Sequence, residues 1–249
     1  MKENIQDSSQ HHQKLQTIST PQDLYKCDVC RDTGYLIKQE EGSQPIMQRC
    51  KCQEIEIAKR QWKSAGLNPD KSKQTFANFE TWNNSSKLAK QTAITYLKNY
   101  TDIKDTRKNS IMLCGQVGSG KTHLSIALAL NFIQKGIRVV YMPYRDVITE
   151  IKQNMLDEEF YKKQISKFQT VEVLLIDDLF KGKVTESDIN IMFEIINHRY
   201  LNYLPIIVST EFTMERMLNF DEAVGSRIYE MCKDYTVQIE GKENNYRLK

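Results

Sequence analysis

The sequence predicts an α/β protein in which helices flank a parallel β-sheet. From residue 110 onwards, short apolar runs alternate with helical stretches, and the runs are apolar throughout. This pattern is typical of parallel strands that are covered on both faces. A glycine-rich run, GQVGSGKT at 115–122, separates the first apolar run from a helical stretch. A phosphate-binding loop stands at that place in folds of this class.

The strands and helices are expected to alternate in a regular order. Strands are expected at 111–114, 139–142, 173–176, 206–209 and 237–239. Helices are expected at 121–135, 145–168 with a break, 187–203 and 213–219. Two further helices should precede the sheet, one at 53–65 and one from Ser85 or Ser86 to about Tyr100. In the second of these we expect Leu88, Ile94 and Leu97 to face inwards.

The chain divides into three parts by composition. Residues 1–24 are polar and predict a disordered tail, 25–70 a small cysteine-bearing domain, and 71–249 the α/β domain. No run of eighteen apolar residues and no signal peptide is present, so we expect a cytoplasmic protein with no membrane partner. The net charge of +3 is too small to indicate nucleic-acid binding by itself.

The run GQVGSGKT matches the pattern G-x-x-x-x-G-K-[ST] of phosphate loops. Its glycines allow backbone conformations in which N–H groups turn towards phosphate oxygens, and the following helix adds its positive N-terminal end. Lys121 is expected to reach the β- and γ-phosphates, and Thr122 to supply a hydroxyl to Mg²⁺. The predicted nucleotide-binding set is Gly115, Gly118, Ser119, Gly120, Lys121, Thr122 and His123.

Two later strands are expected to contribute polar side chains. In LLIDDLF, at 174–180, four apolar residues lead to a pair of carboxylates. Asp177 is expected to hold Mg²⁺ with Thr122, and Asp178 to orient or deprotonate a water molecule. In IIVSTEF, at 206–212, Thr210 either senses the γ-phosphate or is an ordinary solvated strand end. The first of these roles requires that strand to lie between the two strands that contact phosphate.

The first four cysteines have the spacing C-x₂-C-x₁₉-C-x-C. Two close pairs joined by a loop predict a tetrahedral Zn²⁺ site made of Cys27, Cys30, Cys50 and Cys52. A segment this short has too few apolar residues for its own core, so a metal would stabilise it. The alternatives are redox chemistry at Cys27 and Cys30, or a ligand supplied by His11 or His12. Cys114 and Cys232 are interpreted as core thiols.

Residues 75–249 resemble the AAA+ ATPases, and among them the helicase loaders of the DnaC/DnaI type. The motifs that carry this resemblance are GQVGSGKT, LLIDDLF, IIVSTEF, VGSRIYEM and NNYRLK. The resemblance implies ATP as cofactor, Arg227 as an arginine finger that reaches the ATP of a neighbouring subunit, and Arg247 as a second arginine on the nucleotide's own subunit. Because 29 residues follow Phe220, no full C-terminal lid is expected.

The resemblance also implies a function. The protein would deliver a replicative DnaB-type helicase onto single-stranded DNA, gripping the helicase through its zinc-binding domain and assembling into a ring or spiral. ATP hydrolysis would be weak and dependent on assembly or on a partner. Lysines and aromatics at 145–168 are candidates for DNA contact, or simply a solvated helix: Lys152, Tyr161, Lys162, Lys163, Lys167 and Phe168.

Other functions share some of these motifs. The nearest is an IstB-like ATPase that helps DNA transposition, although such helpers usually lack a zinc-binding front end. A small-molecule kinase would need an acceptor pocket and commonly an arginine-bearing lid, and the sequence indicates neither. A nucleic-acid-binding adaptor that holds ATP only as a structural ligand is the remaining alternative.

Overall fold

The computed structural model describes residues 25–39 and 43–248. The disordered tail predicted at 1–24, with His11 and His12, lies outside the described residues. The described residues form two compact units, which divide between Cys50 and Lys51.

The first unit contains a two-stranded antiparallel hairpin that the sequence did not predict. Its strands are β1 (Tyr35–Lys38) and β2 (Ile46–Arg49), with Tyr35 opposite Arg49. Their side chains are mostly exposed, including those of Ile37 and Met47. Without a buried face there is no alternation of apolar and polar residues to indicate a strand. Turns surround Cys30 in this unit.

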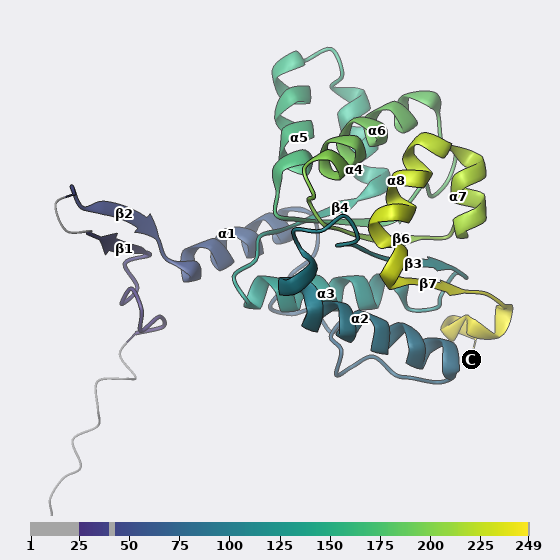
Figure 1. Ribbon diagram of the computed structural model, residues 1–249, viewed down its shortest axis with the longest axis horizontal. Helices are drawn as coiled ribbons and strands as arrows, with labels where there is room; N and C mark the ends of the chain where they lie inside the picture. The colour runs from purple at the N-terminus through teal and green to yellow at the C-terminus, as the bar shows by residue number, and fades with distance from the viewer. Residues whose placement is uncertain (1–24, 40–42, 249) are drawn as a thin grey trace, which may run out of the picture. The chain divides into compact units, whose positions relative to one another are not determined.

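The second unit is built on a five-stranded parallel sheet, and it confirms the predicted fold class. The strand order is β4-β5-β6-β3-β7, and every neighbouring pair is parallel. The strands are β3 (Ile111–Gly115), β4 (Val139–Pro143), β5 (Val173–Leu179), β6 (Ile206–Thr210) and β7 (Thr236–Ile239). Figure 1 shows helices on both faces of this sheet. Strand β6 lies between β3 and β5, which meets the condition set for the sensor role of Thr210, so the strand IIVST separates the two strands that carry the phosphate loop and the paired aspartates.

The helices agree with the predicted ranges to within a few residues, with one addition. They are α1 (Lys51–Ser64), α2 (Asn84–Ile103), α3 (Lys121–Gln134), α4 (Tyr144–Gln153), α5 (Glu158–Thr170), α6 (Glu186–Leu201), α7 (Met214–Phe220) and α8 (Glu222–Cys232). The break predicted within 145–168 separates α4 from α5. Helix α8, which contains Arg227, was not predicted as a separate helix.

Helix α2 begins earlier than predicted and presents a different face to the core. Asn83 is the N-cap, and the Ser86 hydroxyl accepts a hydrogen bond from the Asn83 N–H at 3.0 Å, which completes a capping box. Leu88, expected to face inwards, is 57% exposed. Tyr96 and Tyr100 are buried instead. Leu97, also expected to face inwards, is partly buried and packs against the core, and Ile94 is half-buried. The buried face is made mainly by alanine and tyrosine positions.

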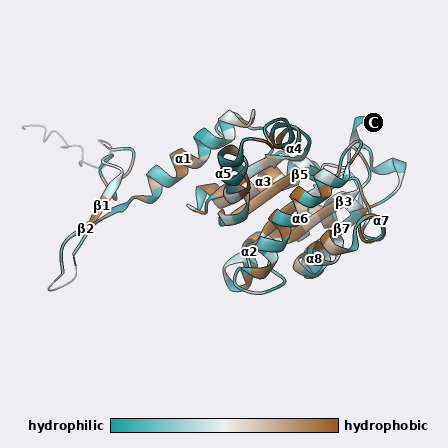
Figure 2. Ribbon diagram, turned by 90° about the horizontal axis from the view of Figure 1, so that it is seen from above, coloured by the Kyte–Doolittle hydropathy of each residue, from teal (hydrophilic) through white to brown (hydrophobic). Residues whose placement is uncertain are grey.

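Both faces of the sheet are buried, which explains its apolar strands. Alternate residues of β3 belong to different core clusters: Met112 to one, Ile111 and Leu113 to the other. Successive strand residues point to opposite faces, so each cluster lies on one side of the sheet. In Figure 2 the strands are largely hydrophobic, and the helices carry hydrophilic stretches.

Helix α1 is anchored to the second unit through Trp62. The Trp62 side chain is completely buried, and its indole N–H donates a 2.9 Å hydrogen bond to the Val139 carbonyl. Its ring centroid lies 5.4 Å from that of Tyr141. Burial of a tryptophan with a satisfied N–H is a strong packing interaction, so α1 is part of the core of the second unit.

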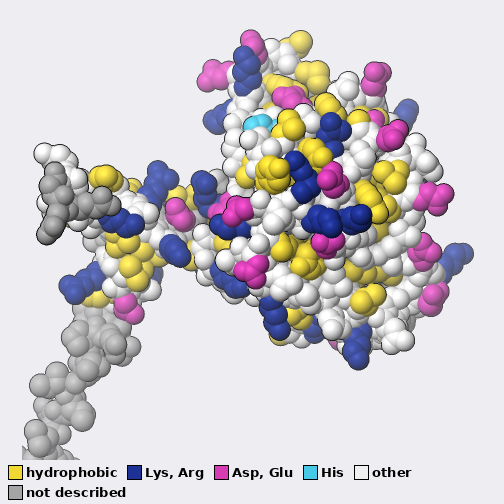
Figure 3. Space-filling model, viewed as in Figure 1, with side chains coloured by type: hydrophobic (Ala, Val, Ile, Leu, Met, Phe, Trp, Pro, Cys, Tyr) yellow, Lys and Arg dark blue, Asp and Glu magenta, His cyan; other side chains and the backbone are white. Residues whose placement is uncertain are grey.

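Charged side chains are well mixed on the molecular surface seen in Figure 3. Basic and acidic side chains lie interspersed there, with hydrophobic side chains between them. That face therefore carries no broad surface of a single sign, in keeping with the net charge of +3. Among the described residues, no helix has the length and apolar content needed to span a bilayer.

Candidate functional site

The phosphate loop lies between the end of β3 and the start of α3. Gly115, Gly118 and Gly120 all have positive φ angles, of 101°, 73° and 86°, a region that residues with a Cβ rarely adopt. A Cβ on Gly120 would lie 2.6 Å from the Phe79 ring. The first turn of α3 presents its free N–H groups to this loop. The loop thus has the backbone of an anion-binding cradle.

The Lys121 ammonium group lies inside the loop. The residue is 6% exposed, and its Nζ donates to the carbonyl oxygens of Gly115 at 2.9 Å and Gln116 at 2.6 Å. Burial lowers the pKa of Lys121. The carbonyls position the positive charge at the centre of the loop, where the phosphates of a nucleotide would be held.

Asp177 joins the loop to the neighbouring strands. Its Oδ1 accepts a 2.8 Å hydrogen bond from the Thr122 hydroxyl and another from the Ser209 hydroxyl, and its Oδ2 accepts from Tyr141 at 3.2 Å. Burial raises the pKa of Asp177, and these hydrogen bonds partly oppose that rise. The Thr122 and Asp177 oxygens are hard ligands of the kind that Mg²⁺ prefers, so the residues present fit that ion.

Asp178 is held by a basic residue that follows it closely in the chain. Its backbone N–H donates to the Ser209 hydroxyl at 2.9 Å, and its carboxylate pairs with Lys181 Nζ at 2.7 Å. Lys181 also lies 3.2 Å from Glu211 Oε1. The hydrogen bond with Asp178 raises the pKa of Lys181. Both aspartates thus line the site, but the Asp178 carboxylate is already paired with Lys181.

A cavity of about 420 Å³ brings these groups together. It is lined by the loop, by both aspartates and by the aromatic side chains of Phe79, Trp82 and Tyr246. The rings are neighbours, since the Trp82 centroid lies 5.0 Å from that of Tyr246 and 5.8 Å from that of Phe79. Flat apolar faces beside a phosphate cradle suit a nucleotide base.

The predicted residues His123 and Arg247 also line this cavity. The His123 Nε2 lies 2.8 Å from the Thr75 carbonyl oxygen, so its ring is fixed against the segment before α2. The chain around Arg247 lies against the loop: the Tyr246 N–H donates to the Gly118 carbonyl at 3.0 Å, and the Tyr246 hydroxyl donates to Glu80 at 2.7 Å.

Two predicted catalytic residues lie outside the cavity of their own chain. Thr210 is completely buried, and its hydroxyl donates to the Leu179 carbonyl at 2.8 Å rather than facing the cavity. Arg227 lies on α8, where its guanidinium donates to Asn197 Oδ1 at 3.0 Å and to the Ala223 carbonyl at 2.7 Å. An arginine in that position does not reach the nucleotide cavity of its own subunit.

The aromatic and lysine residues considered for DNA contact are also separated by the fold. Phe168 is buried in the core. Lys152 pairs with Asp188 at 2.6 Å, and Lys162 pairs with Glu158. A continuous face for single-stranded DNA at 145–168 would therefore lack the Phe168 ring. Two of its lysines, Lys152 and Lys162, are already paired with carboxylates.

Several residues of the site were not identified from the sequence. Ser209 and Tyr141 bond to Asp177. Ser209 stands in the motif IIVSTEF directly before Thr210, the residue that was chosen, and Tyr141 belongs to none of the motifs. The aromatics had a weak signal: TFANFETW, at 75–82, is rich in aromatic residues just before α2. The residues that line the site or contact its aspartates without having been predicted include Phe79, Trp82, Tyr141, Lys181, Ser209, Glu211 and Tyr246.

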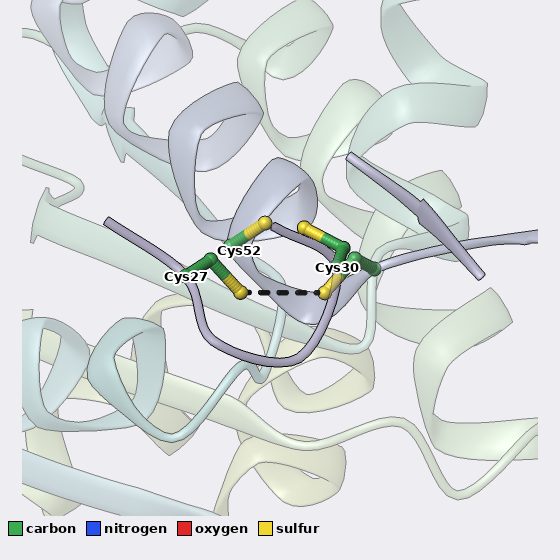
Figure 4. A group of neighbouring side chains, drawn as sticks. Cys27, Cys30 and Cys52 are labelled. Atoms are coloured by element: carbon green, nitrogen blue, oxygen red, sulfur yellow. Dashed lines mark hydrogen bonds between the residues drawn. The ribbon is translucent and has the colours of Figure 1, made fainter. Parts of the chain in front are cut away.

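The cysteine cluster forms where the sequence predicted it. The sulfur atoms of Cys27, Cys30, Cys50 and Cys52 all lie within 4.8 Å of one another. Figure 4 shows Cys27, Cys30 and Cys52 gathered around one point, with the 3.8 Å Cys27–Cys50 sulfur pair marked by a dashed line. Four sulfurs at about 2.3 Å from a central Zn²⁺ would lie about 3.8 Å apart. The donor set and spacing therefore fit a tetrahedral metal site.

The local backbone supports the same interpretation of the cluster. The Gly34 N–H donates to Cys30 Sγ at 3.4 Å, a hydrogen bond that stabilises a thiolate ligand. Arg31 and Asp32 have positive φ angles of 50° and 63°, and they form the tight turn that follows Cys30. Cys114 and Cys232 are buried in the second unit, as predicted for core thiols.

Known proteins resemble this chain over its second unit and, in two cases, over nearly its whole length. The IstB-like ATP binding protein family matches residues 51–249. The uncharacterized protein YqaM of Bacillus subtilis is 34% identical over 258 residues, covering 97% of this chain and 80% of YqaM. The phage-like element PBSX protein XkdC of the same organism is 37% identical over 235 residues, covering 90% of this chain and 86% of XkdC.

Solved structures with the same fold include proteins of DNA replication. The DnaC helicase loader has a TM-score of 0.57 at 24% identity, covering 73% of this chain and 99% of that one. DnaA of Aquifex aeolicus bound to AMPPCP has a TM-score of 0.58 at 24% identity, covering 70% of this chain and 52% of that one. At this identity the likeness shows a shared fold alone.

Proposed function

The chain belongs to the IstB-like ATP-binding protein family, and we propose that it is an ATP-dependent loader of a replicative DNA helicase. The chain is an AAA+ ATPase by family and fold, similar to the DnaC/DnaI type, and residues 51–249 are called the ATPase unit below. The loader function is the finer step of the proposal. It assigns the protein to replication initiation, where it would place a ring-shaped helicase on single-stranded DNA.

The observation that carries the loader assignment is the cluster of Cys27, Cys30, Cys50 and Cys52. The phosphate loop alone would serve any ATPase of this class. A separate metal-stabilised module ahead of the ATPase unit is the expected feature of the DnaI-like branch, and it gives the protein a surface for partner choice. We assign the helicase contact to the domain at 25–70 and ATP hydrolysis to 71–249.

The chemistry of hydrolysis divides between the chain's own residues and a neighbour. Lys121 and the loop N–H groups would hold the β- and γ-phosphates, while Thr122 and Asp177 would hold Mg²⁺. Magnesium, when bound, supplies charge neutralisation at the phosphates. Asp178 would accept a proton from the attacking water after it leaves Lys181. Arg227, which does not line its own cavity, would complete the site of the next subunit in a ring or spiral.

The metal in the cysteine cluster would be zinc, held by all four thiolates. A closed Cys₄ site has no open position for substrate, so its role would be structural. It would stabilise a hairpin whose strands bury few side chains. The four sulfur atoms already lie within 4.8 Å of one another, so little movement would bring them into contact with the ion.

The alternative function is assistance to DNA transposition. An ATP-binding protein of insertion sequence IS21 from Pseudomonas aeruginosa is 26% identical over 144 residues, covering 57% of this chain and 54% of that protein. This relative and the family description both support an ATPase unit. That unit would serve a helicase loader and a transposition helper equally well. It covers only part of the chain, and the loader assignment depends on the cysteine module.

Capture of a helicase distinguishes the two functions. Immobilised full-length protein in Mg·ATP should retain a purified bacterial replicative helicase, and it should not retain an IS21-type transposase. A variant lacking residues 1–50 should lose the helicase while it still binds a fluorescent ATP analogue. This boundary keeps α1, whose Trp62 is buried in the ATPase unit. Retention of the transposase alone would reverse the assignment.

A further inference from the structure

Tyr141 on strand β4 contacts both the proposed magnesium site and helix α1. Its hydroxyl donates a 3.2 Å hydrogen bond to Asp177 Oδ2. Its ring lies beside that of Trp62 on α1, with the two centroids 5.4 Å apart and the rings inclined by 34°. One half-buried tyrosine thus joins a carboxylate that is suited to Mg²⁺ with a helix that packs on the sheet.

The register of the sheet places Tyr141 within reach of Asp177. Pro143 on β4 pairs with Asp177 on β5, and Tyr141 stands two residues before Pro143. Residues two apart on a strand point to the same face, so Tyr141 and Asp177 share one face of the sheet. Two strand residues span about 6.6 Å, a distance that a tyrosine side chain is long enough to cover. The hydroxyl therefore meets the carboxylate diagonally across the two strands.

The Asp177 carboxylate is held at both of its oxygens. Oδ1 accepts from the hydroxyls of Thr122 and Ser209, and Oδ2 accepts from the hydroxyl of Tyr141. The torsion that turns an aspartate carboxylate has a broad energy minimum, so donors on one oxygen do not fix the direction of the other. Mg²⁺ demands nearly ideal octahedral geometry, and hydrogen bonds around a ligand orient it for the ion. The Tyr141 hydroxyl therefore sets the direction of Oδ2.

Trp62 holds the Tyr141 ring from the side of α1. The indole is completely buried, and its N–H donates at 2.9 Å to the carbonyl of Val139, two residues before Tyr141 on β4. The indole is thus bonded to the strand that carries Tyr141, and close packing of the two rings restricts the movement of both. Helix α1 also contains Cys52 of the cysteine cluster. The ring contact therefore connects this helix with a proposed magnesium ligand.

We propose that Tyr141 is a positioning residue for Asp177, and that helix α1 supports it through Trp62. Tyr141 does not line the nucleotide cavity, so it acts on Mg²⁺ binding by orienting the carboxylate. The proposal rests on the ATPase function and on the magnesium role given to Thr122 and Asp177. It does not depend on which partner the protein serves.

The test measures how much Mg²⁺ raises the affinity of the full-length protein for a fluorescent, non-hydrolysable ATP analogue. The ratio of the affinity in excess Mg²⁺ to the affinity in EDTA is called the magnesium gain below. Tyr141→Phe keeps the ring beside Trp62 and removes the hydroxyl. The matched control is Tyr235→Phe, which removes a hydroxyl that accepts from Asn99 at 3.1 Å and does not line the nucleotide cavity.

Tyr141→Phe should lower the magnesium gain by about tenfold, the usual effect of removing a hydrogen bond that orients a metal ligand. Its affinity in EDTA should equal that of the wild type, and Tyr235→Phe should match the wild type in both conditions. Asp177→Asn removes the ligand itself, so an unchanged gain in that variant would reject the magnesium assignment and this proposal together. A gain that falls in Asp177→Asn but not in Tyr141→Phe would overturn the positioning role alone.

The support from α1 is tested by a double-mutant cycle. Trp62→Phe leaves space beside the Tyr141 ring, so it should lower the magnesium gain by itself but not in the Tyr141→Phe background, where the hydroxyl is already absent. Phe132→Leu removes another completely buried ring from the same core cluster, and it should leave the gain unchanged. The support from α1 would be overturned by a wild-type gain in Trp62→Phe, or by an equal loss with and without the Tyr141 hydroxyl.

Discussion

The Thr122 hydroxyl donates a 2.8 Å hydrogen bond to Asp177 Oδ1, and this bond joins the first turn of α3 to strand β5. The two residues are 55 positions apart in the sequence. Their oxygens meet because β5 and β3 are parallel strands of one sheet, separated only by β6. The carboxyl ends of such strands form the ligand-binding edge of the fold. The magnesium site that we propose depends on this pairing.

Asp177→Asn should weaken binding of Mg·ATP by tenfold or more while the fold is retained, because an amide carries no charge for the ion. In the wild type, burial raises the Asp177 pKa above its usual value of 3.8. As the pH falls through that raised pKa, the carboxylate becomes protonated and the magnesium contribution is lost, at a higher pH than an exposed aspartate would require. Calorimetric titrations between pH 7.5 and pH 5 measure both effects. Unchanged Mg·ATP affinity in Asp177→Asn would contradict the assignment.

Arg227→Ala should bind ATP normally and lose most of its hydrolysis. The side chain contacts Asn197 and Ala223 rather than the nucleotide cavity of its own chain, and we propose that it acts in the cavity of a neighbouring subunit. The matched control is Arg216→Ala. Arg216 lies on α7, and its guanidinium carbon stands 3.9 Å from the centroid of the Phe212 ring. Steady-state ATPase assays of the two variants give the comparison.

Mixing Arg227→Ala with Lys121→Ala extends this test. In the mixture, some interfaces join a subunit with an intact phosphate loop to a neighbour with an intact Arg227. These interfaces should hydrolyse ATP, so the ATP turnover of the mixture should exceed that of either variant alone. If turnover in the mixture never rises above the sum of the two variants at any ratio, Arg227 does not act between subunits.

Metal analysis of the purified protein should find about one zinc per chain. The double variant Cys30→Ser, Cys50→Ser should contain none, because two ligands cannot hold a closed tetrahedral site. ATP affinity should not change, since no cysteine of the cluster lines the nucleotide cavity. Cys232→Ala, which removes a buried thiol from the second unit, should keep its zinc. A wild-type protein that is folded at residues 25–50 without metal would contradict the Cys₄ assignment.

Trp62→Ala should lower the free energy of unfolding of the ATPase unit by about 3–5 kcal/mol. The indole is completely buried and donates to the Val139 carbonyl, so its removal leaves a cavity and an unpaired acceptor. The control is Leu88→Ala on the 57% exposed position of α2, which should change stability by less than about 0.5 kcal/mol. Urea unfolding measures both. A Trp62→Ala cost no larger than that of Leu88→Ala would show that α1 is not anchored to the ATPase unit.

The parts of the site encoded in one continuous motif could be predicted from the sequence. The phosphate loop is such a part, since glycines, lysine and threonine occupy fixed places between a strand and a helix. The four cysteines are another, because their spacing alone indicates a shared ligand. The position of Asp177 followed from the end of an apolar strand. These inferences needed no knowledge of how distant segments pack.

Side-chain direction at the end of β6 could not be predicted in the same way. Neighbouring residues on a strand point to opposite faces, so an error of one residue exchanges their surroundings. Ser209 bonds to Asp177, whereas Thr210 bonds to the Leu179 carbonyl. The pairing of β5 is irregular between Ile176 and Leu179, and no local sequence pattern marks that irregularity. The choice of Thr210 as the sensor depended on this register.

The phase of helix α2 was also beyond the sequence pattern. Leu88 was expected to face inwards but is exposed, because Ala89, Ala93 and Tyr96 make the buried face. Small residues allow the helix to approach the sheet closely, and tyrosines fill the space beside it. A prediction based on the spacing of large aliphatic residues does not detect such a buried face.

Loading of a helicase onto closed circular single-stranded DNA tests the central claim most directly. A ring-shaped helicase cannot thread onto a circle that has no end, so unwinding of an annealed oligonucleotide reports loading. The account predicts that the full-length protein, with Mg·ATP, stimulates this unwinding at least tenfold, and that the Cys30→Ser, Cys50→Ser variant does not. Equal unwinding with and without the protein, under conditions where it binds ATP, would contradict the account.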